Sequence, residues 1–171
     1  MCLLRGDRRF IMKQFSIYWL PVIICAGIIF SFSAQPYENQ DLRPTLSSYV
    51  DLSLVHTYFS NVSFTYAGKE ISIQSLGEEG FVEFFIRKGA HLMIYLLLGA
   101  LLYRALVQRT NFSIQKIALA VLLAFSYACS DEFHQSLTPN RTPLFHDVML
   151  DTFGAVIGIV IMVGFYKVRK K

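Results

Sequence analysis

Long apolar runs alternate with polar segments along the chain, and four of these runs dominate the pattern. At about 1.5 Å per helical residue, about 20 residues cross the roughly 30 Å hydrocarbon core of a bilayer. The runs therefore predict four membrane-spanning helices, at about residues 15–34, 84–106, 114–134 and 143–166. We expect residues 1–171 to form one all-α integral membrane domain, a bundle of four transmembrane helices.

The long polar stretch at residues 35–83 is predicted to be an insert between the first and second helices. Two short segments in it, 62–66 and 70–73, alternate apolar and polar residues and flank Ala67-Gly68-Lys69. Such alternation around a short Gly-containing turn is typical of a β-hairpin.

Two further elements are predicted at the two sides of this hairpin. Residues 44–60 have the pattern of a short amphipathic helix that lies on a membrane surface. Gly77-Glu78-Glu79-Gly80 predicts a turn that leads into the second span.

The composition favours a membrane protein over a soluble one. Hydrophobic residues make up 54% of the chain and charged residues 16%, whereas a soluble domain has about 25% charged residues. The net charge is +4, but no module combines stacking aromatic residues with clustered Arg and Lys. Nucleic acid is therefore not an expected partner, and membrane lipid is. The three cysteines do not suggest a disulfide framework.

The distribution of charge predicts the topology. The N-terminal head, the connection at residues 104–116 and the C-terminal tail contain eleven of the sixteen Lys and Arg residues. Residues 35–86 contain seven acidic residues and two basic ones. By the positive-inside rule, both termini are cytoplasmic and the insert is extracytoplasmic. The first apolar run is longer than the 7–15 residues of a usual signal-peptide core, so we expect a retained helix.

Polar residues gather where the second, third and fourth predicted helices meet the extracytoplasmic side. Ionisable groups at the edge of a hydrocarbon layer are costly, so such a cluster indicates a functional site. Residues three or four apart share a helix face. The candidate ligand-binding residues are Lys88, His91, Tyr95, Asp131, Glu132, His134, Gln135, Arg141, Asp147 and Asp151. Gly154 and Gly158 continue the aspartate stripe and favour close helix packing, which would turn both carboxylates into the bundle.

Several roles are open for this cluster. Arg141 is the expected counter-charge to some of the carboxylates. His91, Asp131 and His134 are candidates for acid–base catalysis, although no nucleophile motif such as GxSxG is present. An ion-pair network that only locks the helix ends is the structural alternative. No compact ligand motif such as HExxH is present, so we expect neither a metal nor another cofactor.

Taken together, these motifs resemble the VanZ-like family of bacterial integral membrane proteins. The residues that carry the resemblance are Ser33-Ala34-Gln35-Pro36, Arg87-Lys88-x-x-His91-x-x-x-Tyr95, Ser130-Asp131-Glu132-x-His134-Gln135, Arg141, and Asp147-x-x-x-Asp151-x-x-Gly154. The resemblance covers roughly residues 30–36 and 84–160. The chain departs from the family at Asn140, where the family has a glycine before the arginine.

The resemblance implies a location in the bacterial cell envelope and a link to antibiotic resistance, but no established reaction. The family's namesake is associated with low-level resistance to teicoplanin-type glycopeptide antibiotics at the cell envelope. We therefore expect a multi-pass protein of the bacterial cell membrane with an outward-facing polar pocket. Its ligand would be a lipid-linked cell-wall molecule or a glycopeptide antibiotic. An envelope enzyme that acts on a lipid-linked substrate is the alternative, and the oligomeric state is left open.

Overall fold

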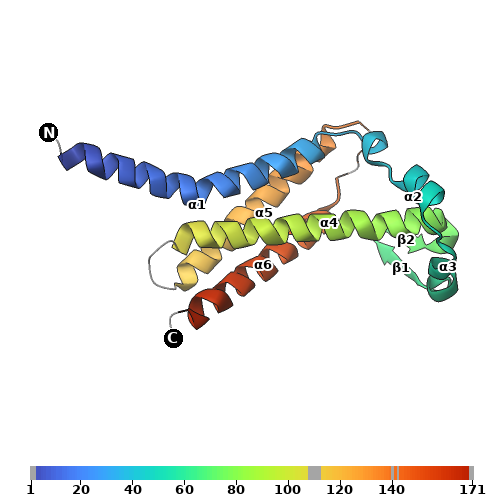
Figure 1. The fold of residues 1–171 in the computed structure, drawn as a ribbon. Coiled ribbons are helices and arrows are strands. Elements are labelled where there is room, and N and C mark those ends of the chain that lie inside the picture. The colour runs from blue at the N-terminus through green and yellow to red at the C-terminus, as the bar shows by residue number, and fades with distance from the viewer. Residues whose placement is uncertain (1–2, 108–112, 140, 142, 170–171) are drawn as a thin grey trace.

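The computed structural model describes residues 3–107, 113–139, 141 and 143–169, with side chains from residue 14 onward. In chain order the elements are α1 (Leu3–Ser33), the 3-10 helix η1 (Tyr37–Gln40), α2 (Arg43–Tyr49), α3 (Ser53–Phe59), β1 (Ser63–Tyr66), β2 (Lys69–Ser72), α4 (Ile73–Val107), α5 (Ile114–Ser136) and α6 (Phe145–Val168). Figure 1 shows α1, α5 and α6 gathered along one part of α4. The start of α1 and the end of α6 lie at one end of this bundle, which we call the termini end. α4 continues past the other long helices and carries α2, α3 and the hairpin at the opposite end, the insert end.

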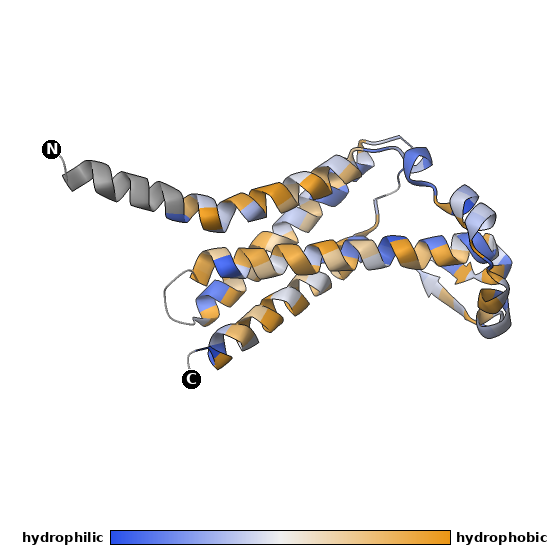
Figure 2. Ribbon diagram, in the orientation of Figure 1, coloured by the Kyte–Doolittle hydropathy of each residue, from blue (hydrophilic) through white to orange (hydrophobic). Residues whose placement is uncertain are grey.

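Four helices in the described part of the chain are long and apolar enough to cross a membrane. They are α1 from Gln14 onward, α4, α5 and α6. Hydrophobic residues follow these helices along most of their length, and hydrophilic residues concentrate toward the insert end (Figure 2). The predicted all-α fold with four spans is confirmed.

The second span begins earlier than the sequence predicted. α4 starts at Ile73 and not near residue 84, so the predicted turn around Gly77 lies inside it. Gly77 has φ 74° and ψ 171°, so a kink at the start of the predicted turn separates a short helical segment at residues 73–76 from the long helix that follows. The first turn is held by a reciprocal cap, because Ser75 N donates to Ser72 Oγ at 3.1 Å and Ser72 N donates to Ser75 Oγ at 3.2 Å.

A small apolar cluster lies at this end of α4. Phe81 is buried together with Ile71 and Ile73, and Val55 and Tyr66 pack against them. Burial of Phe81 removes an aromatic side chain from water, so the cluster holds the helix beyond the kink against the hairpin.

The predicted hairpin is present. β1 and β2 pair antiparallel, with Tyr66 opposite Lys69 and Ser63 opposite Ser72. Ala67 and Gly68 form the two-residue turn with φ of 50° and 78°. Positive φ at both positions matches the twist of the flanking strands, so this turn fixes the register.

The single amphipathic helix predicted at residues 44–60 is wrong in detail. The segment forms two short helices, α2 and α3, separated at Val50, which is extended with φ −122° and ψ 126°. Asp51 stabilises the start of α3, because its Oδ1 accepts a hydrogen bond from the backbone N–H of Ser53 at 3.0 Å. Leu46 and Leu52 are buried, so each half of the segment has its own apolar anchor.

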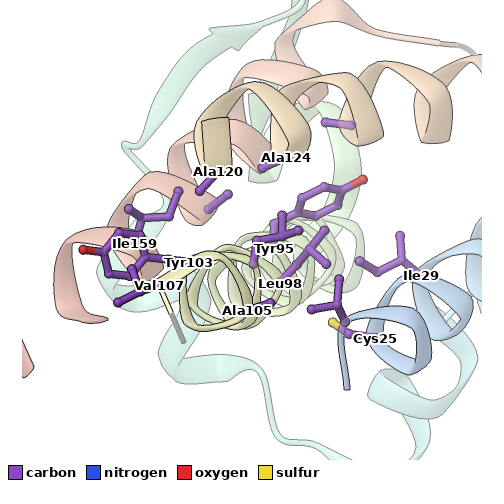
Figure 3. Close-up of a cluster of buried hydrophobic side chains, with 14 of the residues drawn as sticks. Cys25, Ile29, Tyr95, Leu98, Tyr103, Ala105, Val107, Ala120, Ala124 and Ile159 are labelled. Carbon is purple, nitrogen blue, oxygen red and sulfur yellow. The ribbon is translucent and has the colours of Figure 1, made fainter. Parts of the chain in front are cut away.

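α4 and α6 pack closely through glycine, as the stripe of small residues on α6 predicted. A Cβ atom on Gly154 would overlap the carbonyl oxygen of Leu92, and one on Gly158 would overlap that of Leu96. On the other side, a Cβ atom on Gly99 would overlap the backbone of Ala155. The main core lies along this contact and includes Tyr95, Leu98 and Ile159, with alanines of α5 closing it (Figure 3).

Candidate functional site

Two side-chain pairs join α4 to α6 at the insert end. Lys88 Nζ forms an ion pair with Asp147 Oδ1 at 2.5 Å, and the imidazole Nδ1 of His91 lies 3.5 Å from Asp151 Oδ1. The pairs are one turn apart on both helices, because these helices run in the same direction. Asp151 is only 2% exposed, so protein groups and not bulk water must compensate its charge. The two aspartates point into the bundle, as the glycine stripe predicted.

The hairpin is attached to the first of these pairs. Tyr66 of β1 donates a hydrogen bond of 2.5 Å to the same oxygen of Asp147 that Lys88 contacts. Lys88 Nζ also lies 5.0 Å from the centre of the Tyr66 ring, a cation–π contact. Burial raises the pKa of Tyr66 first, and the hydrogen bond to Asp147 raises it further. The hydroxyl therefore keeps its proton and remains a donor over the physiological pH range.

Tyr95 and Asp131 complete the buried centre of the cluster. Tyr95 is fully buried, and its hydroxyl lies close to the carboxylates of Asp131 and Asp151 without forming a hydrogen bond of normal geometry to either. Asp131 is 4% exposed, and its Oδ1 has no hydrogen-bond partner among the described residues. Unpaired buried oxygens are costly, and neither Tyr95 nor Asp131 lines the cavities described below.

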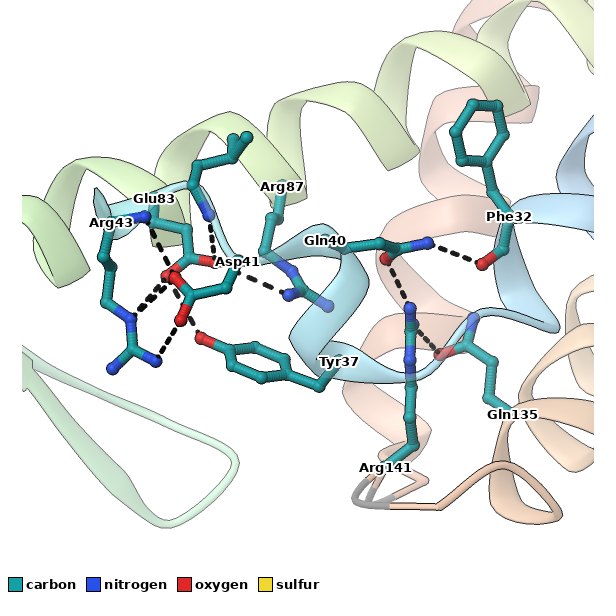
Figure 4. A network of polar contacts seen from close by, with 10 residues as sticks. Phe32, Tyr37, Gln40, Asp41, Arg43, Glu83, Arg87, Gln135 and Arg141 are labelled. Carbon is teal, nitrogen blue, oxygen red and sulfur yellow. Dashed lines mark hydrogen bonds and ion pairs between the residues drawn. The ribbon is translucent and has the colours of Figure 1, made fainter. Parts of the chain in front are cut away.

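A chain of amide contacts links Asp131 to the connection after α1. Gln135 Nε2 donates to Asp131 Oδ2 and to Ser33 Oγ, each at 3.2 Å. Gln135 Oε1 accepts from Arg141 Nη1 at 3.3 Å, and Arg141 Nη2 donates to Gln40 Oε1. Figure 4 shows Arg141 between the two glutamines. The loops that follow α1 and α5 are thereby held side by side.

Arg141 does not have the partners that the sequence predicted. It was expected to balance carboxylates, but no ion pair among the described residues includes it. The reason is its position between two loops, where the amide oxygens of Gln40 and Gln135 accept hydrogen bonds from two of its nitrogen atoms. Burial lowers the pKa of Arg141 and the positive charge of Arg87 lowers it further, whereas the carboxylates of Asp131 and Glu132 raise it. Arg141 thus interacts with two of the predicted carboxylates, but without an ion-pair contact to either.

A cavity of about 340 Å³ opens beside this cluster, between α1 and α4. Its polar lining includes Arg87, His91 and Arg141, and its apolar lining includes Ile28 and Ile94. We call it the α1/α4 cavity. Basic groups and aliphatic groups therefore face the same space.

Of the ten predicted site residues, His91 and Arg141 line this cavity and the other eight do not. Two of those eight, His134 and Glu132, have contacts of their own elsewhere. His134 stacks on Phe30 of α1, with ring centres 4.1 Å apart and planes at 17°, and its Nδ1 has no hydrogen-bond partner among the described residues. Glu132 accepts a hydrogen bond of 2.5 Å from the backbone N–H of Leu144, the N-cap of α6. Glu132 thus holds the start of α6 at Phe145. In the sequence, Thr142-Pro143 has the pattern of an N-cap followed by proline at the first helical position, which predicts a start at Pro143. Thr142 lies outside the described residues.

Comparison with known proteins identifies the family of this chain. The model of the VanZ/LLP1 family matches residues 18–166, which include nearly all of the four spans and every candidate site residue. The chain belongs to the VanZ/LLP1 family. No significant match was found among curated proteins or among solved structures.

Family membership and the four apolar helices make this VanZ/LLP1 chain a multi-pass membrane protein. The family match starts before and ends after the motifs that carry the resemblance. Among the described residues, no group of three His, Cys, Asp or Glu side chains is arranged to hold a metal ion.

The structure adds residues of this VanZ/LLP1 chain that the sequence did not assign to the site. Arg87, Ser33 and Gln40 line the α1/α4 cavity. Arg87 and Ser33 belong to the motifs that carry the family resemblance, and Gln40 does not. Glu83, counted with the acidic insert, is buried and accepts a hydrogen bond from Tyr37 at 3.1 Å. Glu83 also lies 3.6 Å from Arg87. Spacing of four residues along one helix could have indicated only the contact between Glu83 and Arg87, since the other contacts join distant segments.

Proposed function

We propose that this VanZ/LLP1-family protein binds an amphiphilic, negatively charged ligand of the cell envelope, such as a lipid-linked wall precursor. The observation that carries the proposal is the α1/α4 cavity, in which Arg87 and Arg141 share one space with aliphatic side chains. An arginine guanidinium group can donate two parallel hydrogen bonds to the oxygens of a phosphate or a carboxylate. The aliphatic lining suits the first carbons of a lipid chain.

An apolar groove next to the cavity supports a lipid-linked ligand. This α1/α4 groove, about 630 Å³, shares Ile28 and Ile94 with the cavity and continues toward the termini end past Leu20, Ile24 and Leu101. The groove lies between α1 and α4, and Ser16 is the single hydroxyl-bearing residue of its otherwise apolar lining. A ligand in the bilayer could place its chain in the groove and its charged group in the cavity without leaving the membrane.

The proposal includes an orientation. Among residues whose side chains are described, the basic ones near the termini end are Arg104, Lys116, Lys167 and Arg169. The sequence has further Lys and Arg in the N-terminal head, the connection and the C-terminal tail. Under the positive-inside rule the termini end is cytoplasmic, and the cavity then faces the outer leaflet. Envelope precursors and external antibiotics would meet the protein on that side.

A titration in nanodiscs tests the proposal. The full chain in neutral phosphatidylcholine discs is titrated with a long-chain lipid monophosphate and with the alcohol of the same chain. The wild type should prefer the phosphate, and Arg141→Gln should weaken phosphate binding at least about tenfold, because it removes charge-assisted hydrogen bonds. Arg169→Gln is the matched control and should bind like the wild type. Equal binding of phosphate and alcohol would contradict the proposal.

Glycopeptide resistance is the cellular part of the proposal and comes from the family resemblance. Teicoplanin-type antibiotics are amphiphilic and act on lipid-linked wall precursors at the outer face. Expression in a susceptible Gram-positive host should raise the inhibitory concentration of teicoplanin, and Arg141→Gln should abolish the increase. An unchanged inhibitory concentration, with the protein shown to be in the membrane, counts against this role.

A second candidate function, an envelope enzyme, is favoured by one contact. His91 lines the cavity and its Nδ1 faces the buried carboxylate of Asp151, an arrangement that orients a histidine for acid–base catalysis. His134, the other predicted candidate, stacks on Phe30 instead. If the protein turns over a lipid-linked substrate, His91→Gln should stop turnover while the lipid phosphate still binds. Retained turnover in this variant would exclude His91 as the acid or base.

A further inference from the structure

A second cavity, of about 380 Å³, lies between the hairpin and the insert end of α4 and α6. We call it the hairpin cavity. Its lining residues are Tyr37, Arg43, Tyr66, Lys69, Ile71, Leu76, Gly80, Glu83, Phe84, Arg87, Lys88, Gln135, Arg141, Leu144 and Asp147. Arg87 and Arg141 also line the α1/α4 cavity, so the two spaces meet at these guanidinium groups.

The lining of the hairpin cavity has an excess of positive charge. Five of its residues are basic and two are acidic. Glu83 lies 3.6 Å from both Arg43 and Arg87, and Asp147 lies 2.5 Å from Lys88. Arg43 has a further carboxylate at Asp41, 2.6 Å away and outside the cavity.

Two cations of the lining have no carboxylate of their own. No ion pair among the described residues includes Lys69 or Arg141. Arg141 Nε is buried without a hydrogen-bond partner in the described part of the chain, and Arg87 Nη1 has only the 3.6 Å contact to Glu83. Arg141 lies where the two cavities meet, and Lys69 begins β2 of the hairpin.

Aromatic rings hold two of the remaining cations in place. Arg87 lies over the Tyr37 ring at 4.7 Å, and Lys88 lies over the Tyr66 ring at 5.0 Å. Tyr66 is itself fixed to α6 by its hydrogen bond to Asp147. The hairpin side of the cavity is therefore tied to the helices, and its cations are positioned before any ligand enters.

From this arrangement we infer that the hairpin cavity is a second anion site and that the ligand is a lipid diphosphate, or a lipid with an equally extended doubly anionic head. The inference rests on the proposed function. The first anionic group lies between Arg87 and Arg141, and the second extends under the hairpin toward Lys69. Cavities of small-molecule sites have about 300–1,000 Å³, so the hairpin cavity has room for more than a single phosphate.

The test uses three probes on the full chain in phosphatidylcholine nanodiscs. They are a lipid monophosphate, a lipid diphosphate with the same chain, and inorganic diphosphate. The wild type should bind the lipid diphosphate at least about tenfold more tightly than the monophosphate, because a second charged group gains charge-assisted contacts. Inorganic diphosphate should bind more weakly than the lipid diphosphate, since it lacks the chain that fills the α1/α4 groove.

Variants then assign the two sites. Lys69→Gln should remove most of the preference for diphosphate and leave monophosphate binding unchanged, whereas Arg141→Gln should weaken both lipids. Lys167→Gln is the charge-matched control, and thermal melting shows that each variant is folded. Because Lys69 is exposed and lies beside a turn, its substitution should not disturb the fold.

The possible failures are distinct. If the monophosphate and diphosphate lipids bind equally well, or if Lys69→Gln weakens both equally, the second site is overturned while the proposed function stands. If neither lipid binds, the proposed function fails, and the inference fails with it. If inorganic diphosphate binds as tightly as the lipid diphosphate, the hairpin cavity serves a soluble anion and the lipid assignment is overturned.

Discussion

Arg141 differs from the other cations of the cluster in what it contacts. Lys88 and His91 each face a carboxylate of α6, whereas Arg141 contacts the amide oxygens of Gln40 and Gln135. An amide oxygen accepts a hydrogen bond but leaves the positive charge in place. Arg141 therefore retains a charge that an anionic ligand can balance. At this scale the site combines side-chain pairs that hold the helices with a cation that remains available.

A double-mutant cycle on Lys88 and Asp147 measures how much this ion pair contributes to the stability of the fold. Lys88→Met should lower the free energy of unfolding by about 1–3 kcal/mol, because it leaves the partly buried carboxylate without its cation. The variant Lys88→Met/Asp147→Leu should recover part of this loss. The measurement is thermal unfolding in detergent.

Arg141→Gln and the same double variant together test the structural alternative. If the cluster only locks the helix ends, neither variant should change the affinity for the lipid phosphate. If Arg141 binds the ligand, Arg141→Gln should weaken lipid phosphate binding, whereas the double variant, which removes only a pair between two helices, should keep it.

At the scale of elements, the bundle depends on the close contact between α4 and α6. Gly154 and Gly158 bring the α6 backbone against Leu92 and Leu96, and this approach is what sets Asp147 and Asp151 beside α4. Gly164 lies on the same helix near the termini end, and a Cβ atom there would meet no other atom within 4 Å. The glycines near the site therefore have a packing role that Gly164 lacks.

The two kinds of glycine should respond differently to alanine. Gly158→Ala should lower the free energy of unfolding by about 1–3 kcal/mol, because its methyl group overlaps the backbone of α4. Gly164→Ala should be neutral or stabilising by up to about 1 kcal/mol, since alanine is the better helix former. Equal melting temperatures for the two variants would show that the close approach of α4 and α6 is absent.

The sequence could predict elements whose cause is local. Apolar runs predict the four spans, and a short turn with a glycine between alternating segments predicts the hairpin. It could not predict the helical segment that starts at Ile73 before the kink at Gly77, because Ile73 is held by packing with Phe81 and with Ile71 of the hairpin. Nor could spacing within α5 show that His134 turns to Phe30, since that partner lies on another helix.

The site was predictable only where its partners share a helix or a regular helix pair. The match of Lys88 and His91 with Asp147 and Asp151 follows from similar spacing on two helices. The contacts of Arg141 with Gln40, and of Glu83 with Tyr37, join segments far apart in the chain. No periodicity connects such residues, so the amide chain and the basic lining of the hairpin cavity became visible only in the fold.

At the scale of the whole molecule, polar chemistry and basic anchors lie at opposite ends. The cavities, the hairpin and both side-chain pairs between α4 and α6 lie at the insert end. Arg104 and Arg169 lie toward the termini end. This separation predicts one orientation of the molecule in the membrane, and the orientation decides from which side ligands reach the cavity.

Cysteine labelling in intact cells tests this direction. In a variant with every native cysteine replaced by alanine, Tyr58→Cys on α3 should react with a membrane-impermeant maleimide added outside. Val168→Cys should react only after the membrane is permeabilised. Both side chains are 75% exposed, so access to reagent and not burial decides the outcome. The reverse pattern would place the cavity at the cytoplasmic face and remove its access to envelope ligands.

The central claim, that an anionic lipid group binds where Arg87 meets Arg141, is tested most directly by photo-crosslinking. A lipid phosphate with a diazirine close to the phosphate is bound to the full chain, activated and located by peptide mass spectrometry. The account predicts label in residues 28–40 and 87–94, and loss of this label in Arg141→Gln. Label spread over the exposed outer face of α6, at Phe153, Val160 and Ile161, and unchanged in that variant, would contradict it.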